Sequence, residues 1–468
     1  MTEACELTAK YISKAYQARE LSPVEVLQSV RSRVEQTEPL LSACWAVNFD
    51  EAMKVAQASE QRWRTKTQLS AIDGIPISIK EMIATAGVPR PLGTAASDMT
   101  PSLEDAPPAA RAREAGAVIW GKTTNPDFGM LSSGLSSFHA LARNPWNLER
   151  TPGGSSAGAA AAAAAGYGPL HLGTDIGGSL RLPAGWCGIF TLKPSFGRVP
   201  IYPPFIGRVA GPMTRSVGDS ALLMRELCKP DPRDYMSLPP ADIDWNGLEL
   251  DIAGLRIGLM TDAGCGTPVA PEVKAAIEAA AMLFENAGAI IEPLEPFLTR
   301  DMLEGLDTFW RTRFLAETSQ LPPQLYAKIL PYIREWGEGA SNADSIEVFH
   351  GFNQIAAMQE NGLRHFGCLD FLISPVAPEP AFPAEWPSPT RDPARPFEHI
   401  AFTVAYNMTG QPAASINCGF TSTGLPIGMQ IVGKRFDDLK VMQLSQFWEK
   451  SRSHPMEWPR LNRQPPRP

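Results

Sequence analysis

A run of small residues between positions 151 and 193 constrains this chain more than any other feature. It contains two Gly-Gly-Ser units, at 153–155 and 177–179, and seven consecutive alanines at 159–165. Alanine has the highest helix propensity and adds no bulk, so the alanines predict a helix packed tightly inside a core. Glycine allows positive φ and close backbone approach, so each unit predicts a tight turn that presents a serine and backbone N–H groups.

Three interpretations of these turns follow from the residues alone. A phosphate cradle would use a glycine-rich turn before a helix, but a P-loop needs Gly-Lys-Ser/Thr and no lysine follows either turn. A nucleophile elbow matches Gly-x-Ser-x-Gly at 154–158, but residues 143–150 before it do not form a hydrophobic strand. A packing motif with ordinary serines explains the alanines. It does not explain why Thr174, Asp175, Ser179 and Arg181 cluster in the second turn.

Taken together, residues 153–158 and 173–181 resemble the central motif of the amidase signature family, and the resemblance extends over most of the chain. It implies a catalytic set of one lysine and two serines, which matches Lys80, Ser155 and Ser179. The chain departs from the family pattern in small ways: Ala157 replaces a common glycine, Glu81 stands where aspartate is more usual, and residues 201–209 are atypical.

The matched lysine needs a special environment before it can act as a base. A serine hydroxyl is a poor nucleophile until a base removes its proton, and an amine can do so only when neutral. Lys80 ends a predicted strand at 75–79, and we expect burial among its isoleucines to lower the lysine pKa. In this scheme Ser179 is the nucleophile and Ser155 relays the proton to Lys80. The resemblance also implies a cis Gly154–Ser155 peptide.

Residues around the nucleophile complete the predicted site. The consecutive N–H groups of the second turn are expected to form an oxyanion hole, because glycines let the backbone curl around a developing negative charge. We expect Asp175 to fix this loop, and Arg181 either to pair with Asp175 or to face the substrate. Ser132 lies in a stretch that borders the site in relatives. The oxyanion-hole residues are Ile176, Gly177, Gly178 and Ser179.

Helical and strand patterns alternate along the chain, with strands expected at 117–120, 255–260, 289–293, 371–374 and 427–432. This alternation predicts one large α/β domain over residues 1–468, with a central mixed β-sheet covered by helices on both faces. Its core motif region spans about 70–220. Residues 296–350 are helical and aromatic, so they either form a layer over the sheet or line a substrate pocket that determines specificity. The Pro/Arg-rich tail, 455–468, is expected to be poorly ordered.

Composition narrows the remaining possibilities. A net charge of −8 without a basic cluster argues against a nucleic-acid partner. Seven scattered cysteines predict free thiols in a reducing compartment, and six histidines without metal-ligand spacing predict no metal site and no cofactor. The first ten residues lack an apolar stretch, so we expect no signal peptide, no membrane association and a cytoplasmic location.

These observations favour an amidase that hydrolyses the carbon–nitrogen bond of a small aryl or aliphatic amide through a Ser179 acyl-enzyme. Its partner would be that small molecule, with no nucleic acid and no membrane, and a homodimer is allowed. The alternative is the glutaminase component of a tRNA-dependent amidotransferase, which would need partner subunits. A second alternative is a non-catalytic binding protein, but all three residues of the catalytic set are present.

Overall fold

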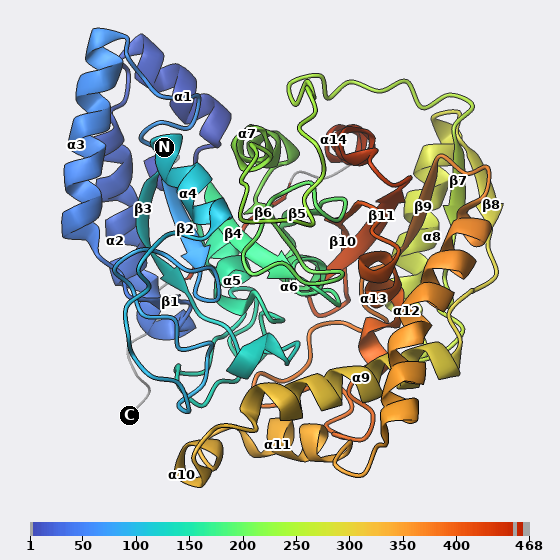
Figure 1. The fold of residues 1–468 in the computed structure, drawn as a ribbon. Helices are drawn as coiled ribbons and strands as arrows, with labels where there is room; N and C mark the ends of the chain where they lie inside the picture. Colours follow the sequence, from blue (N-terminus) through green and yellow to red (C-terminus); the bar gives the residue numbers. More distant parts are fainter. Residues whose placement is uncertain (1–2, 453–455, 462–468) are drawn as a thin grey trace.

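One mixed sheet of eleven strands runs through the part of the chain that the computed structural model describes, residues 3–452 and 456–461 (Figure 1). Their order is β1-β3-β2-β4-β6-β5-β10-β11-β9-β7-β8. The strands are β1 (Cys44–Trp45), β2 (Pro76–Lys80), β3 (Val118–Thr123), β4 (Leu170–Asp175), β5 (Phe190–Lys193), β6 (Val209–Thr214), β7 (Arg256–Leu259), β8 (Ile290–Pro293), β9 (Phe371–Pro375), β10 (Ala413–Phe420) and β11 (Pro426–Gly433). Parallel pairs lie toward the two ends of the sheet, where β2 pairs with β3 and β4, and β7 with β8 and β9.

Helices cover both faces of this sheet, as predicted. The α-helices are α1 (Ala9–Ala18), α2 (Pro23–Leu41), α3 (Phe49–Thr65), α4 (Pro107–Glu114), α5 (Ala157–Ala165), α6 (Arg181–Cys187), α7 (Val217–Leu227), α8 (Pro271–Asn286), α9 (Arg300–Thr318), α10 (Pro323–Tyr326), α11 (Pro331–Glu338), α12 (Ser345–Phe366), α13 (Ala401–Met408) and α14 (Asp438–Ser451). Short 3₁₀ turns occur at Ala4–Glu6, Asp127–Gly129 and Glu398–Ile400. Helices α4, α7, α8 and α14 share one core with the sheet, while α6, α9, α12 and α13 share another. The predicted single α/β domain is therefore confirmed.

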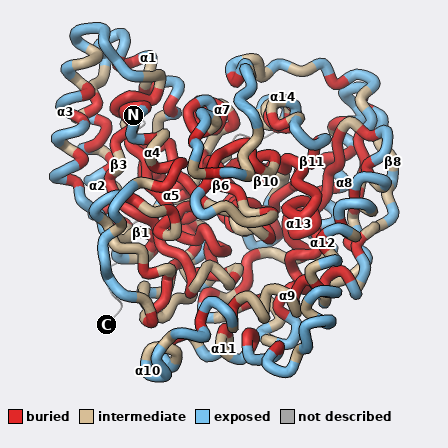
Figure 2. The backbone as a smooth tube through the Cα atoms, viewed as in Figure 1, coloured by how far each residue is buried: buried red, intermediate tan, exposed pale blue. Residues whose placement is uncertain are grey.

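The alanine run forms the predicted core helix, α5. All nine of its residues are buried, and they lie near the middle of the buried region in Figure 2. Three of its alanines pack against α2 and β3, and four pack against α6, β6 and the loops between them. At Gly158 a Cβ atom would stand 2.1 Å from the Ala43 carbonyl oxygen and 2.5 Å from the Thr124 amide nitrogen. Even a methyl group has no room at Gly158, and the buried alanines that follow it let the rest of the helix pack closely against its neighbours.

Residues 296–350 are mainly helical, as expected, and form α9, α10, α11 and the beginning of α12. In Figure 1 these helices lie along one side of the sheet, below α13 and close to the loops after β3. Of the predicted poorly ordered tail, the structure describes 456–461, where the Trp458 ring lies 4.4 Å from the Arg215 guanidinium. The other tail positions lie outside the described residues. Within the described ranges, no helix has both the length and the apolar character needed to cross a membrane.

Candidate active site

Lys80 is buried at the carboxyl end of β2, on the sheet face that carries α5. Side chains alternate along a strand, so Ile77 and Ile79 point into the opposite core while Lys80 points toward the glycine turns. Its Nζ lies 2.8 Å from Ser155 Oγ and 2.9 Å from Thr174 Oγ1. Burial lowers the Lys80 pKa to about 7, although the Asp175 and Glu81 carboxylates oppose that change.

The expected lowering of the lysine pKa therefore has a different structural origin. The isoleucines of β2 do not surround the amine, because strand alternation places them on the far face. The amine is desolvated instead by the first glycine turn, α5 and Thr174, which enclose it together with a third hydroxyl, Ser156 Oγ, at 3.2 Å.

The first glycine turn places Ser155 against the lysine. The Gly154–Ser155 peptide is cis, as the resemblance implies. A Cβ at Gly154 would stand 2.5 Å from the Leu131 carbonyl oxygen and 2.6 Å from the backbone of Ser133, so only glycine fits between these chains. The same close approach brings the neighbouring Ser132 to the cavity that Ser155 also lines.

Ser156 is the nucleophile in the elbow interpretation, but its hydroxyl is hydrogen-bonded to the backbone of Thr174. Its hydroxyl donates to the Thr174 carbonyl at 3.1 Å and accepts from the Thr174 amide at 3.2 Å, in addition to its contact with Lys80. These contacts tie the beginning of α5 to the end of β4. A hydroxyl that holds two chain segments together, and that is fully buried, is poorly placed to attack a substrate.

Ser179 lies at the second glycine turn, and its side chain is partly exposed to the same cavity as Ser155. Its carbonyl accepts a hydrogen bond from the Ser156 amide at 3.2 Å, which holds the two turns together. Among the described contacts no hydrogen bond joins the hydroxyls of Ser155 and Ser179. Such bonds are often long before substrate binds, so the geometry allows a relay without displaying its second step.

Asp175 organises the second turn through its carboxylate. It accepts from the Gly178 amide at 2.8 Å and from the Leu180 amide at 3.1 Å. This corrects one expectation, since the Gly178 N–H is bound to Asp175 and is not free to stabilise an oxyanion. The three other amides of the predicted oxyanion hole have no acceptor among the described residues; they belong to Ile176, Gly177 and Ser179.

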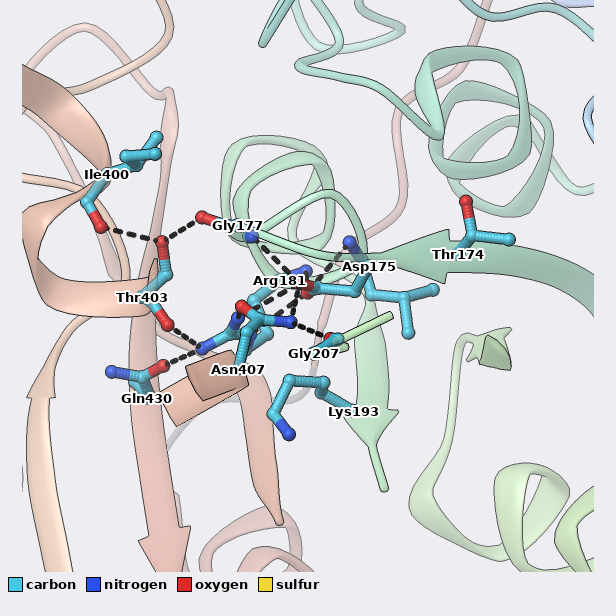
Figure 3. A network of polar contacts seen from close by, with 12 residues as sticks. Thr174, Asp175, Gly177, Arg181, Lys193, Gly207, Ile400, Thr403, Asn407 and Gln430 are labelled. Carbon is cyan, nitrogen blue, oxygen red and sulfur yellow. Dashed lines mark hydrogen bonds and ion pairs between the residues drawn. The ribbon is translucent and has the colours of Figure 1, made fainter. Parts of the chain in front are cut away.

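Arg181 pairs with Asp175, which decides between its two predicted positions. The guanidinium is fully buried and lies 3.0 Å from the Asp175 carboxylate (Figure 3). It also donates to Asn407 at 2.5 Å and to Gln430 at 2.7 Å, while Asn407 donates to Asp175 at 2.9 Å. Burial raises the Asp175 pKa, but the Arg181 charge outweighs it and holds that pKa well below its ordinary value. Arg181 therefore supports the loop from behind and does not line the cavity.

Asn407, Thr403 and Gln430 are the members of this network that the sequence did not reveal. They lie on α13 and β11, more than 220 residues after Asp175. Asn407 and Gln430 stand in segments that resemble the family, and that was the available signal. A polar residue within an apolar helix or strand is a further sign of a buried partner, but it does not name the partner.

The cavity in front of the serines encloses about 950 Å³, counted out to its mouth. Residues from four segments, 128–138, 201–209, 300–336 and 376–390, contribute to its lining. The contributors include Phe128, Ser132, Arg208, Trp310, Phe314, Tyr332, Trp336, Pro387 and Ser388. Four aromatic residues of the 296–350 region therefore line the cavity, while others in that region, such as Phe309, pack only against neighbouring helices. Part of this region therefore forms a helical layer and part of it lines the cavity, while its role in substrate specificity stays a prediction.

Two of the six histidines lie beside the site. His139 contacts Glu81 at 2.7 Å behind Lys80. His399 lines the cavity and is buried, burial lowers its pKa to about 3, and its ring nitrogens have no partner among the described residues. The sequence did not predict that His399 lies at the cavity. The spacing of histidines was used there to judge metal binding, and it does not indicate where a single histidine lies. Within the described residues no group of three or more His, Cys, Asp or Glu side chains could hold a metal ion.

Comparison with known proteins assigns the family. The family model described as Amidase matches residues 25–442. This chain belongs to the amidase family. The resemblance carried by the glycine turns is thereby confirmed, and the structure of a bacterial aryl acylamidase of the amidase signature enzymes agrees. It matches with a TM-score of 0.88 at 28% identity, over 95% of this chain and 96% of that one.

Curated relatives of this amidase point in a second direction. The A subunit of the glutamyl-tRNA(Gln) amidotransferase of Symbiobacterium thermophilum is 33% identical, over 96% of this chain and 97% of that protein. The same subunit of Chloroflexus aggregans is 32% identical over equal shares. These names contradict the expectation of no nucleic-acid partner. That expectation was wrong because net charge describes one chain, whereas nucleic acid can be bound by other subunits of an assembly.

Proposed function

We propose that this amidase cleaves its substrate through an acyl-enzyme on Ser179. The observation that carries the proposal is the buried Lys80 amine, 2.8 Å from Ser155 Oγ and with a pKa lowered to about 7. A neutral amine at this position can accept a proton from Ser155 while Ser155 takes one from Ser179. The Ser179 oxygen then adds to the amide carbonyl.

The other residues of the turn would serve the intermediate. Negative charge develops on the carbonyl oxygen, and the free amides of Ile176, Gly177 and Ser179 are the donors nearest in sequence to the nucleophile. The protonated relay returns its proton to the leaving nitrogen, which departs as an amine or ammonia. Water then attacks the Ser179 ester by the same relay, releasing the acid and restoring the free serine.

Labelling with a fluorophosphonate, followed by intact-protein mass spectrometry, tests this chemistry without knowledge of the substrate. We expect one adduct on the wild type, none on Ser179→Ala, and labelling slowed at least about a hundredfold in Ser155→Ala and Lys80→Met, because general-base assistance contributes about 10²–10⁴. Ser156→Ala serves as the comparison. Adduct formation that survives in Ser179→Ala and disappears in Ser156→Ala would reject the assignment in favour of the elbow.

For the physiological amide, the relatives favour glutamine. We propose that the chain is a glutaminase subunit that releases ammonia for a tRNA-dependent amidotransferase, supported by 33% and 32% identity to the two amidotransferase subunits over almost their full length. Copurification of the tagged chain from its native host, with partner subunits and glutamyl-tRNA-dependent ammonia release, is the expected result. A chain that purifies alone and hydrolyses amides without tRNA would contradict this role.

A free-standing amidase for an aryl or aliphatic amide is the second candidate, and the cavity favours it. Four aromatic side chains from α9 and α11 line the space in front of the serines, and an apolar acyl or aryl group would bury surface against them. The similar fold of an aryl acylamidase also supports this candidate. Turnover of an anilide with kcat/KM well above that for glutamine, by the isolated chain, would select it.

A further inference from the structure

Two hollows meet at a wall of charged side chains. The first is the catalytic cavity with Ser155 and Ser179, and the second is lined by residues that include Arg90 and 201–203. Arg208, Arg313 and Glu317 border both hollows. These three side chains therefore stand where a substrate in the catalytic cavity would extend toward the second hollow.

Arg208 lacks the partner that a confined guanidinium normally has. Its side chain makes no hydrogen bond and no ion pair with any described residue, and its guanidinium stacks over the Phe205 ring, 5.3 Å from the ring centroid. Arg313 stacks on the same ring at 4.5 Å and pairs with Glu317 at 2.8 Å. Burial, helped by the nearby charges of Arg313 and Arg90, lowers the Arg208 pKa to about 10. The guanidinium is still charged at neutral pH.

The wall therefore holds more positive than negative charge. Arg90, Arg208 and Arg313 face the hollows, while Glu317 is the only carboxylate among the described residues that border both. The Glu317 carboxylate acts on the Arg208 charge, but it pairs directly with Arg313 and makes no hydrogen bond or ion pair with Arg208. A partly desolvated cation that lacks such a direct pair is costly, and the cost is offset when an anion binds. Guanidinium groups match carboxylates in a two-pronged geometry, and the Arg313–Glu317 pair shows that a carboxylate fits beside this ring.

We propose that Arg208, together with Arg313, binds a carboxylate of the substrate, so that the preferred amides carry a carboxylate a few bonds from the scissile carbonyl. This inference rests on the proposed cleavage at Ser179 and names the substrate class for it. Glutamine meets the description, as do monoamides of short dicarboxylic acids. From the sequence we expected a small aryl or aliphatic amide, and no local pattern in the sequence indicates that Arg208 and Arg313 share one wall.

A matched pair of chromogenic amides tests the inference. Glutaryl p-nitroanilide carries a terminal carboxylate, and pentanoyl p-nitroanilide has the same acyl chain length without it. We expect the wild type to favour the glutaryl amide at least tenfold in kcat/KM, and Arg208→Gln to lose most of that preference. Arg208→Lys should fall between, because it keeps the charge and loses the fork. Arg364→Gln, on the exposed side of α12, removes the same charge and should keep the wild-type ratio.

A binding measurement separates failure of this inference from failure of the proposed chemistry. Glutarate should raise the melting temperature of the wild type more than glutaramide does, and this difference should vanish in Arg208→Gln, whether or not either anilide is hydrolysed. Glutarate stabilisation without fluorophosphonate labelling would uphold the subsite and reject the Ser179 chemistry. Equal effects of glutarate on wild type and Arg208→Gln, with equal substrate ratios, would overturn the subsite while leaving the chemistry intact.

Discussion

Lys80 can accept a proton only in molecules whose amine is neutral, so its pKa decides the pH range of activity. Burial places that pKa at about 7. Below this value the amine is charged, and kcat/KM should rise with pH until about pH 7 and then level off. We expect a midpoint at least two pH units below the ordinary lysine value. A single rise centred near pH 10, or a flat profile from pH 5 to 10, would contradict the role of Lys80.

The pH profile of activity also tests the role of Arg208. Its charge is one of those that lower the Lys80 pKa, so Arg208→Gln should move the midpoint of the profile to higher pH. A bound carboxylate partly neutralises the same charge and should move it in the same direction, which appears as a higher midpoint in kcat than in kcat/KM for the glutaryl amide. The neutral pentanoyl amide supplies the comparison, because its two midpoints should agree.

At the scale of single elements, the packing of α5 requires a residue without a Cβ atom at position 158. A methyl group at Gly158 would meet two backbone atoms at 2.1 and 2.5 Å, and backbone cannot move aside as a flexible side chain can. We expect Gly158→Ala to lower the free energy of unfolding by about 3 kcal/mol or more. Gly218→Ala is the matched control in α7, where nothing lies within 4 Å of the added Cβ, and it should gain up to about 1 kcal/mol. Urea unfolding measures both, and equal effects would disprove the packing argument.

The helices and strands that could be predicted from the sequence are those whose own residues show a helical or strand pattern. Strand β2 was predictable because isoleucines alternate along it, and α5 because every residue of it except Gly158 is alanine. Strand β4 was missed because polar His171 and small Gly173 lie on the face opposite Leu170 and Leu172, so the segment lacks the continuous apolar run of a strand buried on both faces. His171 is nevertheless buried, and it contacts Ser78 at 2.7 Å. Strand β5 and strand β10 pair across more than 200 residues, which no local pattern reports.

The site divides in the same way. Lys80, Ser155 and Ser179 lie in segments that resemble motifs of the family, so the resemblance grouped them before the structure placed Lys80 beside Ser155 and both serines at one cavity. Arg208 and His399 lie in segments without such a motif. The pairing of β6 with β4 brings Arg208, the residue before β6, to the cavity, and the packing of the 398–400 turn against the second glycine turn brings His399 there. The Gly178 amide was assigned wrongly because the sequence does not show which amides Asp175 already binds.

For the whole molecule, burial of lysines links stability to pH. Lys80, Lys122 and Lys193 are all buried, and burial lowers each pKa to about 7 from the ordinary 10.5. Between these values the unfolded chain binds one more proton per lysine than the folded one. Stability should therefore rise with pH across this window, by about 1.4 kcal/mol per pH unit for each lysine. Below pH 7 the lysines are charged in both states, and their contribution to the slope disappears.

Lys122 offers the cleanest test, because it lies outside the catalytic set and its amine hydrogen-bonds, among the described residues, to Ile83 O and Thr85 Oγ1 and to no carboxylate. Lys122→Met should reduce the slope of unfolding free energy between pH 7.5 and 9 by about 1.4 kcal/mol per pH unit. The slope is the informative quantity, because the substitution also removes the hydrogen bonds of the amine to Ile83 O and Thr85 Oγ1 and so lowers stability at every pH. Lys274→Met, on the exposed face of α8, should leave the slope at the wild-type value. An unchanged slope in Lys122→Met would show that the Lys122 amine stays protonated in the folded core. Burial would then not be enough to make a lysine neutral in this protein, and the argument for a neutral Lys80 would lose support.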